Sequence, residues 1–89
     1  MQNKRTILNE LFNQVSADLK ELGIARNFKP LCYVKLDKYK ENQINLTARP
    51  LLTFKAKKQL RISFDKYAQQ HGFTMNYINL PEENGTGVV

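Results

Sequence analysis

Apolar residues recur at steps of three and four over residues 6–22, which is the spacing of an amphipathic helix with one buried face. Thr6 can cap the start of this helix, and Gly23 follows its last apolar residue as a stop signal. The apolar stripe consists of Ile7, Leu8, Leu11, Phe12, Val15, Leu19 and Leu22. The first part of the chain is therefore predicted to be a helix that packs against a core.

A second helix is predicted further along the chain, between a capping residue, Thr53, and a terminating glycine, Gly72. Ile62 lies off its apolar stripe and is expected to be partly exposed. The stripe consists of Leu60, Phe64, Tyr67, Ala68 and His71. Both predicted helices therefore need an apolar surface to cover.

The segments between and after the helices favour strands. Residues 31–39 and 43–49 alternate apolar and polar side chains, which indicates half-buried strands. The polar residues 40–42 between them suit a short loop, so the pair is predicted to form a β-hairpin. Residues 73–80 favour a third strand because their aromatic and β-branched side chains fit a pleated surface, although their alternation does not select one face.

The predicted order is therefore α-β-β-α-β, typical of a small two-layer α+β fold. We expect the two helices to pack on one face of a three-stranded sheet and to leave the other face open to solvent or to a partner. If the second and third strands are parallel neighbours, their helical crossover should be right-handed. Residues 1–81 are expected to form one domain and residues 82–89 a flexible tail.

Composition excludes several classes of protein. The 89 residues contain 25 Leu, Ile, Val and Phe, enough for one folded domain. The single cysteine allows neither an internal disulfide nor a multi-cysteine zinc site, and no apolar run is long enough to span a membrane. The N-terminal segment lacks the uncharged apolar core of a secretory signal. We expect a cytoplasmic protein without a cofactor or metal ion.

The net charge of +6 is unevenly distributed along the chain. Residues 1–23 are neutral and residues 67–89 carry two acidic side chains with no Lys or Arg. Residues 24–66 contain eleven cations and three carboxylates, a net charge of +8. A basic segment of this kind favours polyanionic partners, and nucleic acid is the most common of them.

The start of the second predicted helix is the first candidate site. Helix N-termini carry a partial positive charge and favour acidic side chains, yet this helix begins with lysines. A bound phosphate would reverse that unfavourable interaction and would accept hydrogen bonds from free backbone N–H groups. The candidate contacts are Lys55, Lys57, Lys58 and Arg61, with Arg49 nearby. An equally weighted alternative is that these lysines only keep the protein soluble.

The polar face of the predicted hairpin is the second candidate site. Aromatic and basic side chains on an exposed sheet can hold single-stranded nucleic acid, since rings stack on bases and cations meet phosphates. The face should present Tyr33, Lys35, Tyr39, Asn45, Thr47 and Arg49. The alternative is structural, because Tyr and Thr favour strands in any case. Tyr33, Lys35 and Arg49 are the proposed contacts.

The residues that are most often catalytic have structural explanations here. His71, the single histidine, is predicted at a helix C-terminus, where it can cap a carbonyl group. Cys32 lies on the apolar side of a predicted strand, and burial raises the pKa of a thiol. We therefore predict no enzymatic activity, with a small ribonuclease that uses the histidine as a minor alternative.

The leading hypothesis is nucleic-acid binding of low sequence specificity, because phosphate contacts carry no direct information about bases. The main alternative is a protein-interaction module, either a regulator or an inhibitor. It would bind an acidic protein surface or form a homodimer, using the open sheet face or an edge strand. Small regulators encoded by mobile elements are of this size, which is an analogy of class only.

Overall fold

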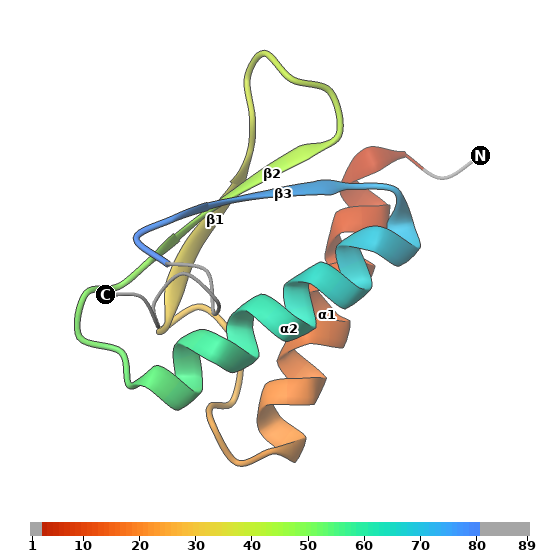
Figure 1. Ribbon diagram of the computed structural model, residues 1–89. Helices are drawn as coiled ribbons and strands as arrows, with labels where there is room; N and C mark the ends of the chain where they lie inside the picture. Colours follow the sequence, from red (N-terminus) through yellow and green to blue (C-terminus); the bar gives the residue numbers. More distant parts are fainter. Residues whose placement is uncertain (1–2, 81–89) are drawn as a thin grey trace.

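The computed structural model describes residues 3–80 and contains five elements. In chain order they are α1 (Lys4–Glu21), β1 (Cys32–Leu36), β2 (Gln43–Ala48), α2 (Phe54–His71) and β3 (Thr74–Ile78) (Figure 1). The predicted order and fold class are confirmed. The flexible tail predicted at residues 82–89 lies outside the described residues.

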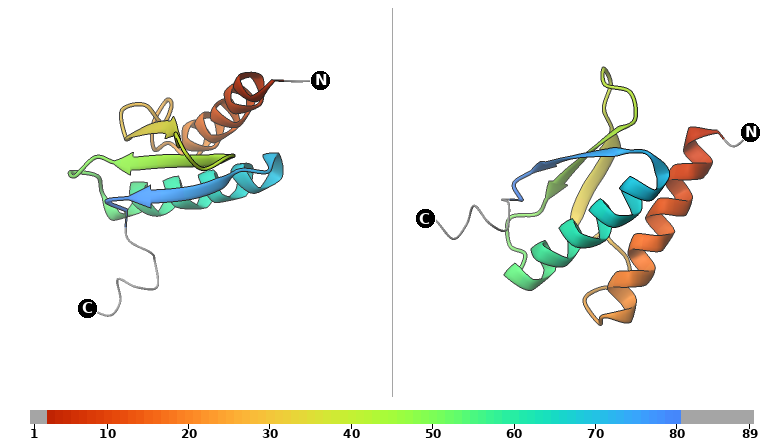
Figure 2. Two further views of the ribbon diagram at one scale, coloured as in Figure 1. Left: turned by 90° about the horizontal axis from the view of Figure 1, so that it is seen from above. Right: turned by 45° about the vertical axis from the view of Figure 1, so that its right-hand side comes forward.

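The sheet is mixed, with β2 in the centre. β1 pairs with β2 antiparallel, as the hairpin prediction requires, and β3 pairs with β2 parallel on the other side. Both helices lie on one side of the sheet, and the other side is uncovered (Figure 2). This arrangement gives the molecule one layer of helices and one layer of strands.

The core lies between the two layers. Leu11, Val15 and Leu19 from α1 and Leu60 and Phe64 from α2 have no exposed surface. They meet the inward-facing side chains of the central strand, which are Ile44, Leu46 and Ala48. Both predicted helical stripes therefore supply the core, except that Leu22, at the end of the first stripe, is 51% exposed. Ile62 is 45% exposed, as its place off the second stripe predicted.

The ends of the helices follow the expected capping chemistry with one exception. Helix α1 begins at Lys4, because the Asn3 side chain accepts a hydrogen bond from the backbone N–H of Thr6 at 2.8 Å. The prediction of Thr6 as the cap was therefore wrong: an asparagine three residues earlier offers an equally good acceptor. Gly23 follows the helix with φ +72°, in the left-handed region that favours glycine.

The caps of α2 are those that the sequence predicted. The Thr53 hydroxyl accepts from the backbone N–H of Ala56 at 3.1 Å, and Gly72 ends the helix with φ +80°. This cap places the lysines of the first two turns at the end of the helix that lies next to the end of β2.

Strand β1 is shorter than the predicted 31–39. The Asp37 carboxylate accepts hydrogen bonds from the backbone N–H groups of Tyr39 and Lys40, both at 2.8 Å, which turns the chain out of the strand. Tyr39 therefore lies in the hairpin loop, and its prediction on the polar sheet face was wrong. Among residues 3–80, neither helix is long and apolar enough to cross a membrane.

Candidate nucleic-acid interface

The uncovered side of the sheet gathers the outward-facing residues of all three strands. Because side chains alternate along a strand, the neighbours of the buried β2 residues point away from the helices. Tyr33, Thr47 and Ile78 share one row across the sheet, and Lys35, Asn45 and Asn76 share the next. We call this surface the open face; it comprises Tyr33, Lys35, Gln43, Asn45, Thr47, Arg49, Thr74, Asn76 and Ile78.

Arg49 and Tyr33 are in contact with each other on the open face. The guanidinium carbon of Arg49 lies 4.5 Å from the centroid of the Tyr33 ring, a cation–π geometry. The Arg49 backbone N–H donates to the Leu31 carbonyl at 3.1 Å, which fixes the base of the side chain. Its Nε atom is buried and has no hydrogen-bond partner within residues 3–80. A buried donor without an acceptor is uncommon.

A hydrogen-bonded network of amides occupies the other end of the open face. Asn45 donates to Asp37 Oδ2 at 3.0 Å and accepts from Asn76 at 3.1 Å. Gln43 Nε2 donates to both Asp37 and Asn45. The hydrogen bond from Asn45, and those from the backbone of Lys40 and Tyr39, lower the pKa of the Asp37 carboxyl. The Asp37 carboxylate therefore lies at the loop end of the open face, where Lys35 shares the row of Asn45, and Arg49 lies at the opposite end.

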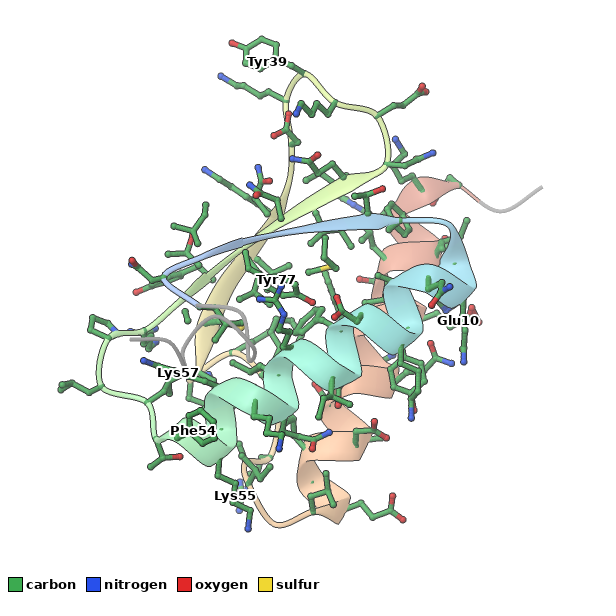
Figure 3. All side chains as sticks on the ribbon, in the orientation of Figure 1. Glu10, Tyr39, Phe54, Lys55, Lys57 and Tyr77 are labelled. Carbon is green, nitrogen blue, oxygen red and sulfur yellow. The ribbon has the colours of Figure 1, made fainter. Side chains whose placement is uncertain are left out.

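The start of α2 forms a separate basic surface. It has no acidic residue in its first turn; Lys55 and Lys58 are exposed and Lys57 is half-buried. These lysines belong to α2, in the helical layer, whereas the other candidate contacts lie on the open face of the sheet (Figures 2 and 3). The two groups of candidate contacts therefore lie in different layers, near the same end of β2.

The side chain of Arg61 makes contacts within the fold. Its guanidinium carbon lies 4.3 Å from the centroid of the Tyr77 ring, and its Nη1 donates to the Leu80 carbonyl at 3.1 Å. The Tyr77 hydroxyl in turn donates to Asp65 at 2.5 Å. These contacts join the end of β3 to α2, so Arg61 has a structural task that the sequence pattern did not reveal.

Apolar side chains surround the α2 start, a feature that the charge pattern concealed. Leu51 is 96% exposed and Phe54 is 64% exposed. A groove of about 310 Å³ lies beside them, between the end of α1 and the start of α2. Its lining residues are Gly23, Ile24, Leu31, Leu51, Leu52, Thr53, Lys55 and Ala56. The sequence signal for this apolar surface was the pair of adjacent leucines after Pro50, which lie outside every predicted element.

The two residues considered for catalysis lie in the helical layer and the core. His71 Nε2 is 2.8 Å from Gln14 Oε1, so the imidazole links α2 to α1. Cys32 is 2% exposed, and burial raises its pKa to about 12. Residues 3–80 contain no group of three or more His, Cys, Asp or Glu side chains arranged to hold a metal ion.

Comparison with models of protein families, with curated proteins and with solved structures finds no match to this chain. The surfaces described above are therefore the remaining indication of function. Of these, the open face combines an exposed aromatic ring with two cations, Lys35 and Arg49.

Proposed function

We propose that this protein binds nucleic acid through the open face, with Arg49, Tyr33 and Lys35 as the principal contacts. The observation that carries the proposal is the guanidinium of Arg49 held over the ring of Tyr33, a side chain that is 61% exposed on the open face. A base can stack on the exposed tyrosine ring, and phosphate oxygens can accept from the arginine and from Lys35.

The lysines at the α2 start contribute attraction rather than direct contact in this proposal. They lie in the helical layer, whereas the open face belongs to the sheet. Their field decays over a Debye length of about 8–10 Å at physiological salt, so it raises the local concentration of a polyanion near that end of the molecule. Binding should discriminate weakly between sequences because most contacts go to phosphates and to ring faces.

Fluorescence anisotropy with labelled oligonucleotides tests the proposal. The probes are oligothymidine and oligouridine of about 15 nucleotides, and a mixed-sequence duplex of similar length. Each is titrated at about 50 mM and about 200 mM salt. We expect binding at the lower salt concentration and a steep loss of affinity at the higher one. Absence of binding to every probe at low salt contradicts the proposal.

Two substitutions identify the surface that binds. Tyr33→Ala should weaken binding by about 5- to 150-fold, the range observed when a stacking ring is removed. Arg49→Gln should weaken binding and reduce the dependence of log K on log salt by about 0.7–0.9 per lost phosphate contact. Arg26→Gln is the matched control, since it removes the same charge from an exposed connector residue. Equal losses for Arg26→Gln and Arg49→Gln would show that only net charge matters.

A protein-interaction role, in a regulator or inhibitor, is the second candidate, and the exposed Leu51 and Phe54 beside the groove favour it. Lysines around an apolar groove would suit an acidic protein with apolar anchors, or the apolar surface could pair in a homodimer. Light scattering of the wild-type protein and of Leu51→Ser/Phe54→Ser tests the homodimer. A dimer that the double substitution dissociates supports it, whereas a monomer in both cases contradicts it.

The minor alternative of a small ribonuclease requires His71 to act in catalysis. In the proposed function it joins the two helices through Gln14 instead. Incubation of wild-type protein and His71→Gln with labelled RNA distinguishes the two roles. Cleavage by the wild type that the substitution abolishes would support the ribonuclease, and intact RNA in both samples contradicts it.

A further inference from the structure

The loop between β1 and β2 carries an exposed aromatic side chain, that of Tyr39, which the sequence predicted on the polar sheet face and the structure places in the loop. Tyr39 is 90% exposed, and Figure 3 shows it at the tip of the hairpin, away from the body of the protein. Within residues 3–80 its side chain has no hydrogen bond and no ring contact. The ring thus exposes apolar surface to water and gains no contact within the described fold.

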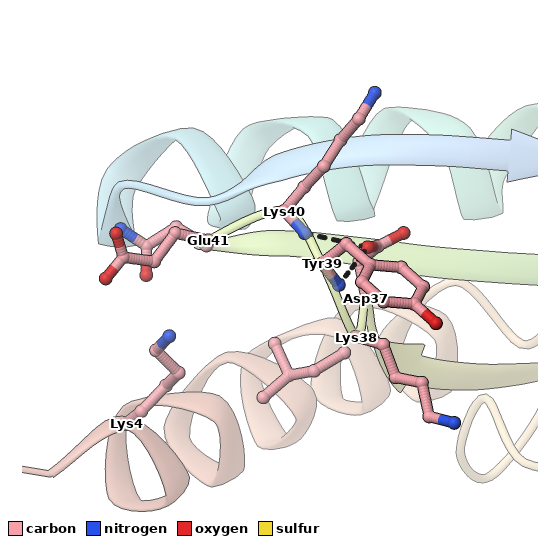
Figure 4. Close-up of a pocket in the computed structure, with 8 residues that line it drawn as sticks. Lys4, Asp37, Lys38, Tyr39, Lys40 and Glu41 are labelled. Atoms are coloured by element: carbon pink, nitrogen blue, oxygen red, sulfur yellow. Dashed lines mark hydrogen bonds between the residues drawn. The ribbon is translucent and has the colours of Figure 1, made fainter.

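The conformation of this loop is held at several points. Asp37 Oδ1 accepts from the backbone N–H groups of Tyr39 and Lys40, as the dashed lines in Figure 4 mark. At the other side of the loop, the Asn42 carbonyl accepts from the Thr74 backbone at 2.8 Å. Asn42 itself has φ +57°. The tip is therefore fixed to both edge strands, and Tyr39 is presented by an ordered backbone.

The local charge of the tip indicates which interaction it supplies. Residues 37–41 contain two lysines and two acids, so the tip has no net charge. Lys4 faces the loop across a hollow of about 280 Å³ (Figure 4). A neutral tip attracts phosphates weakly, and its distinctive feature is the exposed ring of Tyr39. Stacking is the interaction for which such a ring is suited.

We propose that Tyr39 stacks on an unpaired base, and that the ligand of this protein is therefore single-stranded nucleic acid. This inference rests on the proposed function of the open face. Tyr33 and Tyr39 lie on one hairpin, six positions apart, so at most about 22 Å of chain separates them, with Lys35 between. One strand of a few nucleotides can contact both rings, whereas a duplex keeps its base faces stacked on each other.

The salt dependence of binding distinguishes a stacking role from a charge role. Tyr39→Ala should weaken binding to labelled oligothymidine of about 15 nucleotides by about 5- to 150-fold. The slope of log K against log salt should be the same as in the wild type, because no phosphate contact is lost. Tyr39→Phe is the matched control; it keeps the ring and should bind as the wild type does. Unchanged binding by Tyr39→Ala overturns the inference.

The outcomes separate this inference from the proposed function. If Tyr33→Ala and Arg49→Gln weaken binding but Tyr39→Ala does not, the open face binds nucleic acid and the hairpin tip does not participate. If the wild type binds no oligonucleotide, the proposed function itself fails. If Tyr39→Ala weakens duplex binding as much as single-strand binding, the assignment of a single-stranded ligand is wrong.

A second measurement locates the stacked base. Single abasic positions are introduced along the oligothymidine, and each is titrated with the wild type and with Tyr39→Ala. One position should lose affinity with the wild type but not with Tyr39→Ala, because the ring and its base form an energetically coupled pair. Coupling at no position contradicts stacking. Thermal unfolding of Tyr39→Ala should match that of the wild type, since the side chain is 90% exposed.

Discussion

Cys32 illustrates how burial determines the chemistry of a single residue. It is 2% exposed at the start of β1, and its thiol donates to the Phe28 carbonyl at a sulfur–oxygen distance of 3.7 Å. Desolvation by burial raises the pKa of this thiol to about 12, and the nearby positive charge of Arg49 only partly offsets that effect. The reactive thiolate is therefore scarce at neutral pH.

We predict that Cys32 does not react with a disulfide reagent such as Ellman's reagent in the folded protein at about pH 8. In denaturant the same thiol should react fully within the mixing time of an ordinary assay. The comparison of native and denatured labelling at one pH checks this prediction. Rapid labelling of the native protein would contradict it and would indicate an open, accessible β1.

Asp37 holds the hairpin loop in its ionised form. Hydrogen bonds from Asn45 and from the backbone of Lys40 and Tyr39 lower its pKa in the folded protein. A carboxyl whose folded pKa lies below its unfolded value stabilises the fold above the unfolded value, about 3.9. This stabilisation is lost as the pH falls through the folded pKa.

Asp37→Ala should therefore lower the stability at neutral pH, and the difference from the wild type should shrink as the pH falls below about 4. Urea unfolding at about pH 7 and about pH 3 measures it. Glu41→Ala is the control, because Glu41 is an exposed acid in the same loop. A difference of equal size at both pH values would show that ionisation of Asp37 does not matter.

At the scale of elements, the two helices are joined by polar contacts as well as by the core. Asp18 of α1 accepts from the Tyr67 hydroxyl at 3.0 Å and from the Ser63 hydroxyl at 3.2 Å, both on α2. Ser63 has no exposed surface and also accepts from Gln59 at 2.9 Å. The position of Asp18 on α1 therefore fixes how the helices are aligned along each other.

Asp18→Ala should destabilise the protein by about 1–3 kcal/mol, because it leaves the Ser63 and Tyr67 hydroxyl groups without their acceptor. Tyr67→Phe, which removes one donor, should cost about 1 kcal/mol. Glu10→Ala removes an exposed acid from the same helix and should change the stability little. Urea unfolding of the three variants gives the comparison, and similar stabilities for Asp18→Ala and Glu10→Ala would contradict the alignment role.

The elements themselves were largely predictable from the sequence, because their signals are local. Periodicity identified both helices and the first two strands, residue preferences indicated the third strand, and Thr53 and Gly72 are the observed ends of α2. The error at Thr6 arose because two good caps lie three residues apart. The error at Tyr39 arose because alternation continues past Leu36, where the Asp37 side chain ends the strand by accepting hydrogen bonds from the backbone of Tyr39 and Lys40. Strand order depends on non-local pairing and could not be derived from these patterns.

At the scale of the whole molecule, the sequence predicted the basic residues but not their grouping. Arg49 and Tyr33 are in contact on the open face, and Lys35 lies on the same face because period two places these side chains on one side of the hairpin. The α2 lysines were expected to act with Arg49, and the structure places them in the other layer, on the helices. The net charge of a segment does not say in which layer its side chains lie. The structure was therefore needed to assign the cations to the sheet or to the helices.

This assignment allows the role of the α2 lysines to be measured. A lysine in the first turn of a helix opposes the helix dipole, so Lys55→Gln/Lys57→Gln should stabilise the fold by about 0.3–1 kcal/mol per residue at low salt. The same variant should bind oligothymidine more weakly at about 50 mM salt, with a smaller deficit at about 200 mM, because the lysines act through a screened field. The deficit of Arg49→Gln should shrink only by the slope change of its lost phosphate contact and should persist at about 200 mM salt.

Lys20 supplies the matched control for these two effects. It lies in the last turn of α1, where a cation interacts favourably with the dipole, so Lys20→Gln should lower the stability slightly. Lys20→Gln removes one positive charge but no proposed contact. Its effect on binding should therefore be no larger than the effect of lowering the net charge by one. A Lys55→Gln/Lys57→Gln variant that gains stability and binds as the wild type does would show that these lysines serve solubility alone. Loss of binding together with a gain in stability would instead show that the unfavourable charges at the α2 start are retained for the sake of the ligand.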